Sequence, residues 1–203
     1  SHPSAAGAIR AFLRDTGIPA VSTFQGGGVL SQDMVDQFGG RVGLFHNQPG
    51  DRLLDSADLV VTFGFDPIEY DAGLWNAGKQ RPVVHIDVVP CDIDRNYAPT
   101  VEIVGDIGAI TEALGAATHG QPKAAASPFV AQAGAELDQI KARGAVEESS
   151  PAHPLRIIDE MRKIMSDDVT VALDMGSFHI WHARYLHAFR PQQIMVTNGQ
   201  QTL

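Results

Sequence analysis

A glycine turn between a short apolar run and a helical pattern carries the strongest chemical signal in this sequence. Residues 173–181 read Leu-Asp-Met-Gly-Ser-Phe-His-Ile-Trp, which predicts a buried strand, a turn at Gly176 and a helix that starts near Ser177. Backbone N–H groups at a helix N-terminus bind anions, and the Ser177 hydroxyl and the His179 imidazole can add side-chain donors. The pattern therefore indicates a cradle for a phosphate or diphosphate group.

Residues 194–203 resemble this arrangement. They read Ile-Met-Val-Thr-Asn-Gly-Gln-Gln-Thr-Leu, a short apolar strand that runs into a second glycine turn. In a parallel sheet this turn would open beside the one at Gly176, because the carboxyl ends of parallel strands share one edge. Two neighbouring turns at the ends of parallel strands could together bind a cofactor that carries a diphosphate group.

A triple glycine at 26–28 also follows a strand-like run and precedes a helical one. It does not match G-x-G-x-x-G, and no Walker lysine follows it. The acidic residue that ends a later strand, Asp87, lies far beyond the spacing of about 20 residues found in dinucleotide sites. We therefore interpret these glycines as a tight turn with close packing rather than as a phosphate loop.

Acidic residues and the single cysteine offer weaker signals. Asp66, Glu69 and Asp71 follow an apolar run, at the strand end where ligands of α/β sheets bind. Carboxylates on such loops are usually solvated, so we favour that role over a catalytic pair. Cys91 stands in an acidic loop where a thiolate is disfavoured, so a nucleophilic role is not expected.

Three histidines raise the question of a metal site. His179 and His182 share a helix face at i and i+3. His187 follows two turns later, no HExxH pattern exists, and a zinc site needs a third ligand within reach. No Gly-x-Ser-x-Gly elbow supports a hydrolase triad either. Structural or solvent-facing roles are therefore favoured for these histidines.

Composition excludes two classes of partner. Of the 203 residues, 44% are apolar and 19% are charged, which is typical of a globular chain. The net charge of -9 and the scattered Lys and Arg residues argue against nucleic-acid binding. No apolar run approaches the roughly 20 residues that span a bilayer, so no membrane segment is expected. Without a signal-peptide pattern, and with one cysteine, the chain is expected to be cytoplasmic.

Short apolar runs alternate with helical patterns along the whole chain. Helices are expected at 4–15, 31–38, 51–56, 106–117, 128–143, 154–165 and 178–188. Strands are expected at 20–24, 42–45, 58–64, 82–87, 101–104, 169–173 and 194–197. The alternation predicts an α/β fold with a doubly wound parallel sheet, Rossmann-like in its connections.

Composition shifts divide this pattern into three parts. Residues 1–120 hold one complete α/β domain, and 121–150 form a linker that contains a helix. A fresh alternation at 151–203 reads as the truncated, N-terminal part of a second α/β domain.

Both strand–turn segments resemble the diphosphate-binding domain of thiamine-diphosphate enzymes, in the sequences at 174–181 and 198–203. Within that family the chain is most similar to acetolactate synthases of the catabolic, FAD-independent type. Upstream segments that resemble the central domain of those enzymes lie at 23–25, 40–45, 47–51 and 64–70. The resemblance covers essentially the whole chain.

The resemblance implies cofactor contacts at the first turn. Gly176, Ser177 and Phe178 would lie against the cofactor diphosphate, with Phe178 contributing its backbone. His179 is the imidazole nearest this turn and would replace side-chain donors that biosynthetic relatives carry there.

At the second turn the resemblance implies contacts to the rings of the cofactor. Gln200, Thr202 and Leu203 would approach the aminopyrimidine and the thiazolium. Leu203 stands where the family usually has methionine, a bulky wedge that holds the cofactor bent, and the exchange nearly conserves volume.

The activity implied by the resemblance is that of acetolactate synthase. Such an enzyme condenses two pyruvates to 2-acetolactate with loss of CO2, through a thiamine-diphosphate enamine, and acts as a homo-oligomer with Mg2+. The metal motif would lie beyond Leu203, and the catalytic glutamate would belong to a preceding domain. No catalytic or metal-binding residue is therefore expected within these 203 residues, which alone should be inactive.

FAD is not expected in this chain. The FAD-binding stretch of biosynthetic relatives is of the Arg-Phe-Asp-Asp-Arg type, and residues 64–69 here read Gly-Phe-Asp-Pro-Ile-Glu, without either arginine. Two alternatives to the acetolactate synthase assignment stay open at this point. One is a non-catalytic nucleotide-binding or scaffold domain, and the other is a thiamine-diphosphate decarboxylase or carboligase with a different acceptor.

Overall fold

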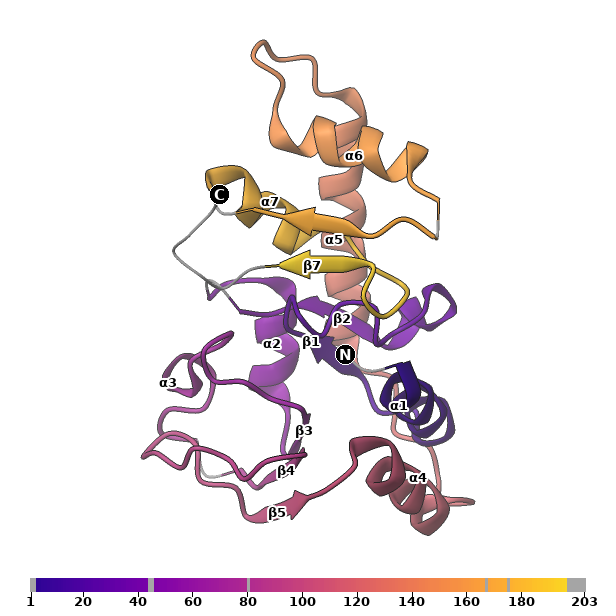
Figure 1. The fold of residues 1–203 in the computed structure, drawn as a ribbon, viewed down its shortest axis with the longest axis vertical. Coiled ribbons are helices and arrows are strands. Elements are labelled where there is room, and N and C mark those ends of the chain that lie inside the picture. Colours follow the sequence, from indigo (N-terminus) through magenta and orange to yellow (C-terminus); the bar gives the residue numbers. More distant parts are fainter. Residues whose placement is uncertain (1–2, 44–45, 80, 167, 175, 197–203) are drawn as a thin grey trace.

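Short parallel strands and helices alternate along the chain (Figure 1). The computed structural model describes residues 3–43, 46–79, 81–166, 168–174 and 176–196. Its elements are α1 (Pro3–Thr16), β1 (Ala20–Ser22), the 3-10 helix η1 (Gln32–Gln37), β2 (Phe38–Arg41), α2 (Pro49–Ser56), β3 (Val60–Phe63), α3 (Ala72–Trp75), β4 (Val83–Asp87), β5 (Val101–Val104), α4 (Ile107–Thr118), α5 (Pro128–Val146), α6 (Pro154–Ile164), β6 (Val171–Leu173), α7 (Ser177–Tyr185) and β7 (Ile194–Val196).

Strand pairing in the described residues is parallel throughout, which confirms the predicted α/β class. β1 pairs with β2, β4 lies between β3 and β5, and β6 pairs with β7. The sheet predicted for residues 1–120 is thus divided in two. A largely apolar cavity of about 490 Å³ is lined by residues of both β1 and β3. We call residues 3–118, with the first two sheets, the first unit.

Helices cover one face of β3 in this first unit. α1 and α4 pack side by side, and Phe12 of α1 meets Phe63 of β3 edge to face, with ring centroids 6.3 Å apart. Ile107 and Leu114 of α4 join the same cluster. Asp106 caps α4 as predicted, since its carboxylate accepts a hydrogen bond from Ala109 N at 2.8 Å.

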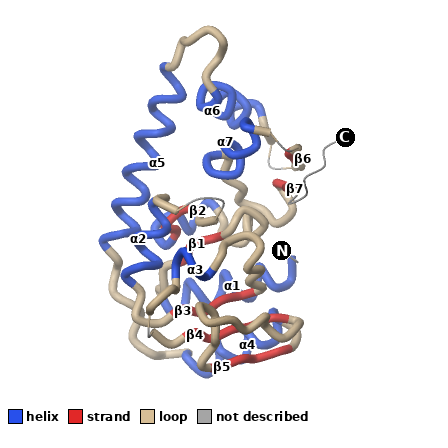
Figure 2. Tube along the Cα trace, turned by 90° about the vertical axis from the view of Figure 1, so that its left-hand side faces the viewer, coloured by secondary structure: helices blue, strands red, loops and turns tan. Residues whose placement is uncertain are grey.

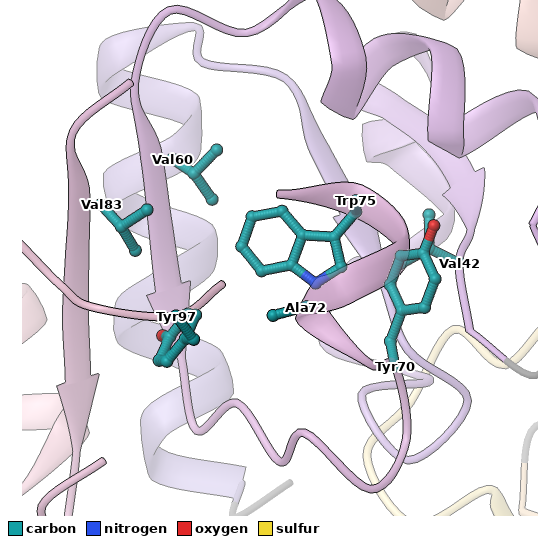
Figure 3. Packing of buried hydrophobic residues seen from close by; sticks show 7 residues of the cluster. All are labelled: Val42, Val60, Tyr70, Ala72, Trp75, Val83 and Tyr97. Carbon is teal, nitrogen blue, oxygen red and sulfur yellow. The ribbon is translucent and has the colours of Figure 1, made fainter. Parts of the chain in front are cut away.

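The opposite face of β3 carries the second core of this unit, shown in Figure 3. Val60 and Val83 meet the aromatic rings of Trp75 and Tyr97, whose centroids lie 6.1 Å apart. Both faces of the strand are therefore covered, as expected for a doubly wound sheet.

The longest helix, α5, joins the two parts of the molecule. It packs on α2 and β2 at one end and on α6 at the other, and it runs along one side of the chain trace (Figure 2). It occupies 19 residues, three more at its C-terminal end than the predicted helix at 128–143.

Residues 154–196, which we call the second unit, have a core of their own. Ile158 of α6, Leu186 and Ala188 after α7, and Ile194 of β7 are buried together. Side chains of β6 and α7 pack around them. Apolar burial of this kind is what holds so short a sheet in place.

One strand prediction is wrong in position. The strand expected at 42–45 lies at Phe38–Arg41 instead, and residues 44–45 lie outside the described residues. Glycine has low strand propensity, which hides this strand in the sequence. Close packing requires glycine at position 39, because a Cβ there would lie 2.3 Å from Cδ2 of Leu53 on α2.

The α-helix predicted at 31–38 is also wrong in type. Residues 32–37 form a 3-10 helix in which the buried Met34 has non-helical angles (φ -108°, ψ 17°). Ser31 occupies the N-cap position, but its hydroxyl donates to the Asp33 carboxylate at 2.5 Å rather than accepting from the helix. The short α3 has no counterpart among the predicted elements.

Candidate functional site

The two predicted turns start from one edge of the second sheet. β6 and β7 are parallel, and Leu173 is paired with Val196 at their carboxyl ends. The side chains of both residues pack on the core of the second unit, which fixes where each strand ends. The structure therefore confirms that the two strands end side by side, as the sequence predicts, at Leu173 and Val196.

Gly176 forms the junction between this edge and α7. Its φ of 155° is one that residues with a side chain rarely adopt. It occupies the N-cap position, and its carbonyl accepts a hydrogen bond from His179 N at 3.1 Å. A glycine cap offers no side-chain acceptor to the first N–H groups of the helix, which suits an external anion. Ser177 and Phe178 at these first positions are exposed.

His179 lies below this exposed turn, with only 5% of its surface accessible. Burial, and then the neighbouring His182, lower the pKa of His179, so its imidazole is neutral at pH 7 and can donate one N–H. Its Nε2 atom is buried and has no hydrogen-bond partner among the described residues. Buried polar atoms are normally paired, so this nitrogen has the capacity to bind a further group.

Gln200, Thr202 and Leu203, the positions predicted at the second turn, lie outside the described residues. Met175 within the first turn does as well. The described half of the site fits a diphosphate, since it combines a glycine junction, an exposed helix start and an unpaired imidazole nitrogen.

His182 has a structural role. It is 1% exposed, its Nδ1 lies 3.0 Å from the carbonyl oxygen of Phe178, and its Nε2 lies 3.3 Å from Sδ of Met161. Within the described ranges, no group of three or more His, Cys, Asp or Glu residues could hold a metal ion.

His187 lies between the two units, with its ring edge-on to Phe38 and Phe189 at centroid distances of 5.7 and 6.5 Å. Burial, followed by the charges of Arg41 and Arg162, lowers the pKa of His187 from 6.5 to about 3. The folded protein therefore keeps this imidazole neutral over a pH range in which the unfolded chain protonates it.

This pKa difference predicts a pH-dependent stability. The contribution of neutral His187 is fully present above pH 6.5 and is lost as the pH falls toward 3. The loss amounts to about 1.4 kcal/mol per pH unit, so about 2 kcal/mol between pH 6.5 and 5. Urea unfolding of the wild type and His187→Phe at several pH values measures it. The variant should show the shallower slope, and equal slopes would contradict the prediction.

A second polar cluster, which the sequence did not reveal, lies at the carboxyl ends of β1, β2 and β3. Arg41, Gln48, Asp51, Glu69 and Tyr70 are all buried there. Arg41 is close enough to Glu69 for their charges to interact, and the Tyr70 hydroxyl donates to the Asp51 carboxylate. One part of this cluster could have been found in the sequence, because Gln48-Pro-Gly-Asp51 has the spacing of a helix capping box.

The acidic residues of the next loop divide into two groups. Asp66 and Asp71 are exposed, and their carboxylates accept hydrogen bonds from Ile68 N at 2.9 Å and Gly73 N at 2.7 Å. The solvated role predicted for Glu69 is wrong, since it is 5% exposed. Burial raises its pKa, while hydrogen bonds from Thr23 and Gln25 act in the opposite direction.

The remaining two sequence signals have structural explanations. Burial, together with Glu102, raises the pKa of the Cys91 thiol to about 11, which agrees with the expectation that its thiolate is disfavoured. A Cβ at Gly28 would lie 2.0 Å from the carbonyl oxygen of Arg190. Close packing, rather than a phosphate loop, is thus the role of the glycine loop at 26–28.

Comparison with known proteins adds independent observations. Residues 1–114 match the family model described as "Thiamine pyrophosphate enzyme, central domain". The chain is 45% identical over 201 residues to the catabolic acetolactate synthase of Raoultella terrigena, covering 96% of this chain and 35% of that protein. It is 41% identical over 206 residues to the acetolactate synthase of Bacillus subtilis (strain 168), covering 100% and 36%.

A more distant relative is the glyoxylate carboligase of Escherichia coli O157:H7, 28% identical over 194 residues, with coverage of 93% and 32%. The chain thus spans about a third of the length of these relatives. None of the helices in the described part of the chain is long and apolar enough to cross a membrane.

Proposed function

The chain belongs to the thiamine pyrophosphate enzymes, and we propose on this basis that it is part of an acetolactate synthase. The observation that carries the proposal is the identity of 45% and 41% to two acetolactate synthases over essentially the whole chain. Identity to the glyoxylate carboligase is lower, at 28%, which favours pyruvate over other acceptors. A scaffold role would not require such similarity across both units.

Residues at the exposed edge of the second sheet would hold the diphosphate of the cofactor. Gly176, Ser177 and Phe178 would donate through their backbone N–H groups, and His179 through its unpaired ring nitrogen. When bound, thiamine diphosphate would supply the carbanion that attacks a carbonyl carbon. The part of this chain is to bind, orient and partly bury the diphosphate end.

Other parts of the site complete this proposal. Gln200, Thr202 and Leu203 would contact the cofactor rings, and residues outside these 203 would hold Mg2+, which would supply positive charge to the diphosphate. Two pyruvates would be condensed to 2-acetolactate with release of CO2, in a cytoplasmic homo-oligomer. The catalytic glutamate would come from a further domain.

FAD has no place in the proposed function. The carboxyl ends of β1, β2 and β3, where a sheet of this class binds its ligand, are filled by buried side chains of this chain. Arg41, Asp51 and Glu69 among them are at most 5% exposed. The Asp51 carboxylate accepts a hydrogen bond from Tyr70, and the charges of Arg41 and Glu69 interact, so these groups would need no flavin as a partner.

We propose that the chain has three structural parts, of which the match of residues 1–114 to the central-domain model supports the first. Residues 1–120 would form the central domain, 121–150 the linker with its helix, and 151–203 the start of the cofactor-binding domain. α5 lies within the linker and packs on α2 and β2 of the first part and on α6 of the third. The linker would therefore hold these two parts in a fixed relative position.

The proposed function predicts how activity depends on the length of the chain. The 203-residue chain alone should form no acetolactate from pyruvate, thiamine diphosphate and Mg2+. The protein whose reading frame extends through it should form acetolactate and CO2 in a one-to-one ratio. Gly176→Ala in that extended enzyme should raise the cofactor concentration needed for half-maximal activity, because a side chain disfavours this φ.

Two results would contradict the proposal. One is an extended enzyme that binds thiamine diphosphate but releases no acetolactate. The other is turnover by the 203-residue chain itself. Product is measured by the colour of acetoin after acid decarboxylation, with a mock preparation as the control.

A further inference from the structure

One arginine of α1 binds three backbone carbonyls at once. Arg10 donates through Nε to the Val29 oxygen at 2.7 Å, and through Nη2 to the Gly28 oxygen at 2.8 Å and the Phe189 oxygen at 3.1 Å. Gly28 belongs to the glycine loop of the first unit, and Val29 follows that loop directly. The third belongs to the second unit, 179 positions along the chain from Arg10.

Phe189 belongs to a segment that we call the link, residues 186–193, which connects α7 to β7. The link approaches the glycine loop very closely. A Cβ at Gly28 would lie 2.0 Å from the Arg190 oxygen and 2.8 Å from Pro191 N. Only a residue without a side chain permits this contact.

A second arginine holds the start of the link. Arg41, which is 4% exposed, donates to the Leu186 oxygen at 3.2 Å and to the Phe24 oxygen at 3.4 Å. Leu186 is the C-cap of α7, and its side chain is fully buried. Burial lowers the pKa of Arg41 to about 10, and the charge of Glu69 acts in the opposite direction, so the guanidinium stays protonated at pH 7.

Guanidinium groups suit this task. Each carries five N–H donors in a fixed plane and so can serve several carbonyls in one orientation. Carbonyl oxygens at the end of a helix and in a loop lack partners within their own element. The two arginines therefore satisfy groups of the second unit that its own residues leave open.

The link lies opposite the proposed cofactor site. α7 starts at the site with Ser177 and ends at the link, and β7 starts after the link and ends at the site with Val196. A helix of nine residues is about 13 Å long, so the link lies about that far from the turn at Gly176. Holding the link, however, fixes the position of both elements that form the site.

We propose that Arg10, assisted by Arg41, is a positioning residue that docks the link onto the first unit and thereby places the diphosphate-binding edge. This inference rests on the proposed function for its cofactor. The packing of the link on the first unit does not depend on the proposed function, because it consists entirely of contacts between described residues.

The test uses Arg10→Met, Arg10→Lys and the matched control Arg14→Met. Arg14 lies one turn further on α1 and pairs with the exposed Asp33. Hydrogen exchange of the 203-residue chain is followed by mass spectrometry. Arg10→Met should accelerate exchange in peptides of 186–196 about tenfold, without changing peptides of β4. Arg10→Lys should restore part of the protection, and Arg14→Met should behave as wild type. Equal exchange in Arg10→Met and Arg14→Met would overturn the docking.

The second measurement is thiamine diphosphate binding by the extended enzyme. Arg10→Met should weaken the affinity about tenfold, with most of kcat recovered at saturating cofactor, whereas Arg14→Met should leave the affinity unchanged. Loss of docking with unchanged cofactor affinity would overturn the positioning role. An unmodified enzyme that binds no thiamine diphosphate would instead refute the proposed function, and the exchange result would still stand on its own.

Discussion

Replacing Gly28 with alanine is expected to destabilise the chain by about 2–5 kcal/mol. The φ of +84° at this position costs a residue with a side chain about 1–2 kcal/mol. The added Cβ would also lie 2.0 Å from the carbonyl oxygen of Arg190. Backbone atoms cannot rotate away as a side chain can, so relieving this overlap costs about 1–3 kcal/mol more.

Gly7→Ala is the matched control for Gly28→Ala. Gly7 lies on the exposed side of α1, and a Cβ there would meet no atom within 4 Å. Alanine should stabilise this helix by about 0.5–1 kcal/mol. Urea unfolding followed by circular dichroism measures both changes. A Gly28→Ala variant as stable as the wild type would show that the glycine loop and the link are not in contact.

Replacing Asp51 with alanine is expected to cost about 3–5 kcal/mol of stability. Its carboxylate accepts hydrogen bonds from the Tyr70 hydroxyl and, at 2.6 Å, from Gln48 N. All three residues are buried, so the variant would leave two donors without an acceptor, each at about 1–3 kcal/mol. Burial and the Asp51 charge raise the pKa of Tyr70, which keeps its hydroxyl available as the donor.

Asp55→Ala, one turn later on α2, provides the comparison. Asp55 pairs with Lys79 at the surface, where both side chains are more than a third exposed, and such pairs contribute about 0–1 kcal/mol. Midpoints of urea unfolding should therefore separate the two variants clearly. Similar losses for Asp51→Ala and Asp55→Ala would mean that the buried cluster does not hold α2 to the loop at Tyr70.

Local patterns predicted the elements that need no distant partner. The strands β3, β4 and β5 and the helix α4 follow from apolar runs and from the capping residue Asp106, because each signal lies within a few residues of the element it defines. The strand β2 was placed four residues too late, since its glycines are selected by contact with Leu53 and not by strand propensity.

The candidate site was predicted in the same uneven way. The turn at Gly176 and the shared edge of β6 and β7 were recognisable, because a strand, a glycine and a helix start stand next to one another in the sequence. The burial of Glu69 was not, although its loop was singled out. Whether a carboxylate is solvated depends on what packs over it, and Arg41 comes from another strand.

The sequence by itself thus determined the α/β class, the positions of most strands and helices, and the strand–turn–helix that would bind a diphosphate. It also indicated close packing at the glycine loop. Only the tertiary structure decided what packs there, since Arg10 and Phe189 are 179 positions apart. Hydrogen bonds to backbone carbonyls leave no trace in residue type at the acceptor. The contacts by which the second unit packs on the first could therefore be identified only from the three-dimensional structure.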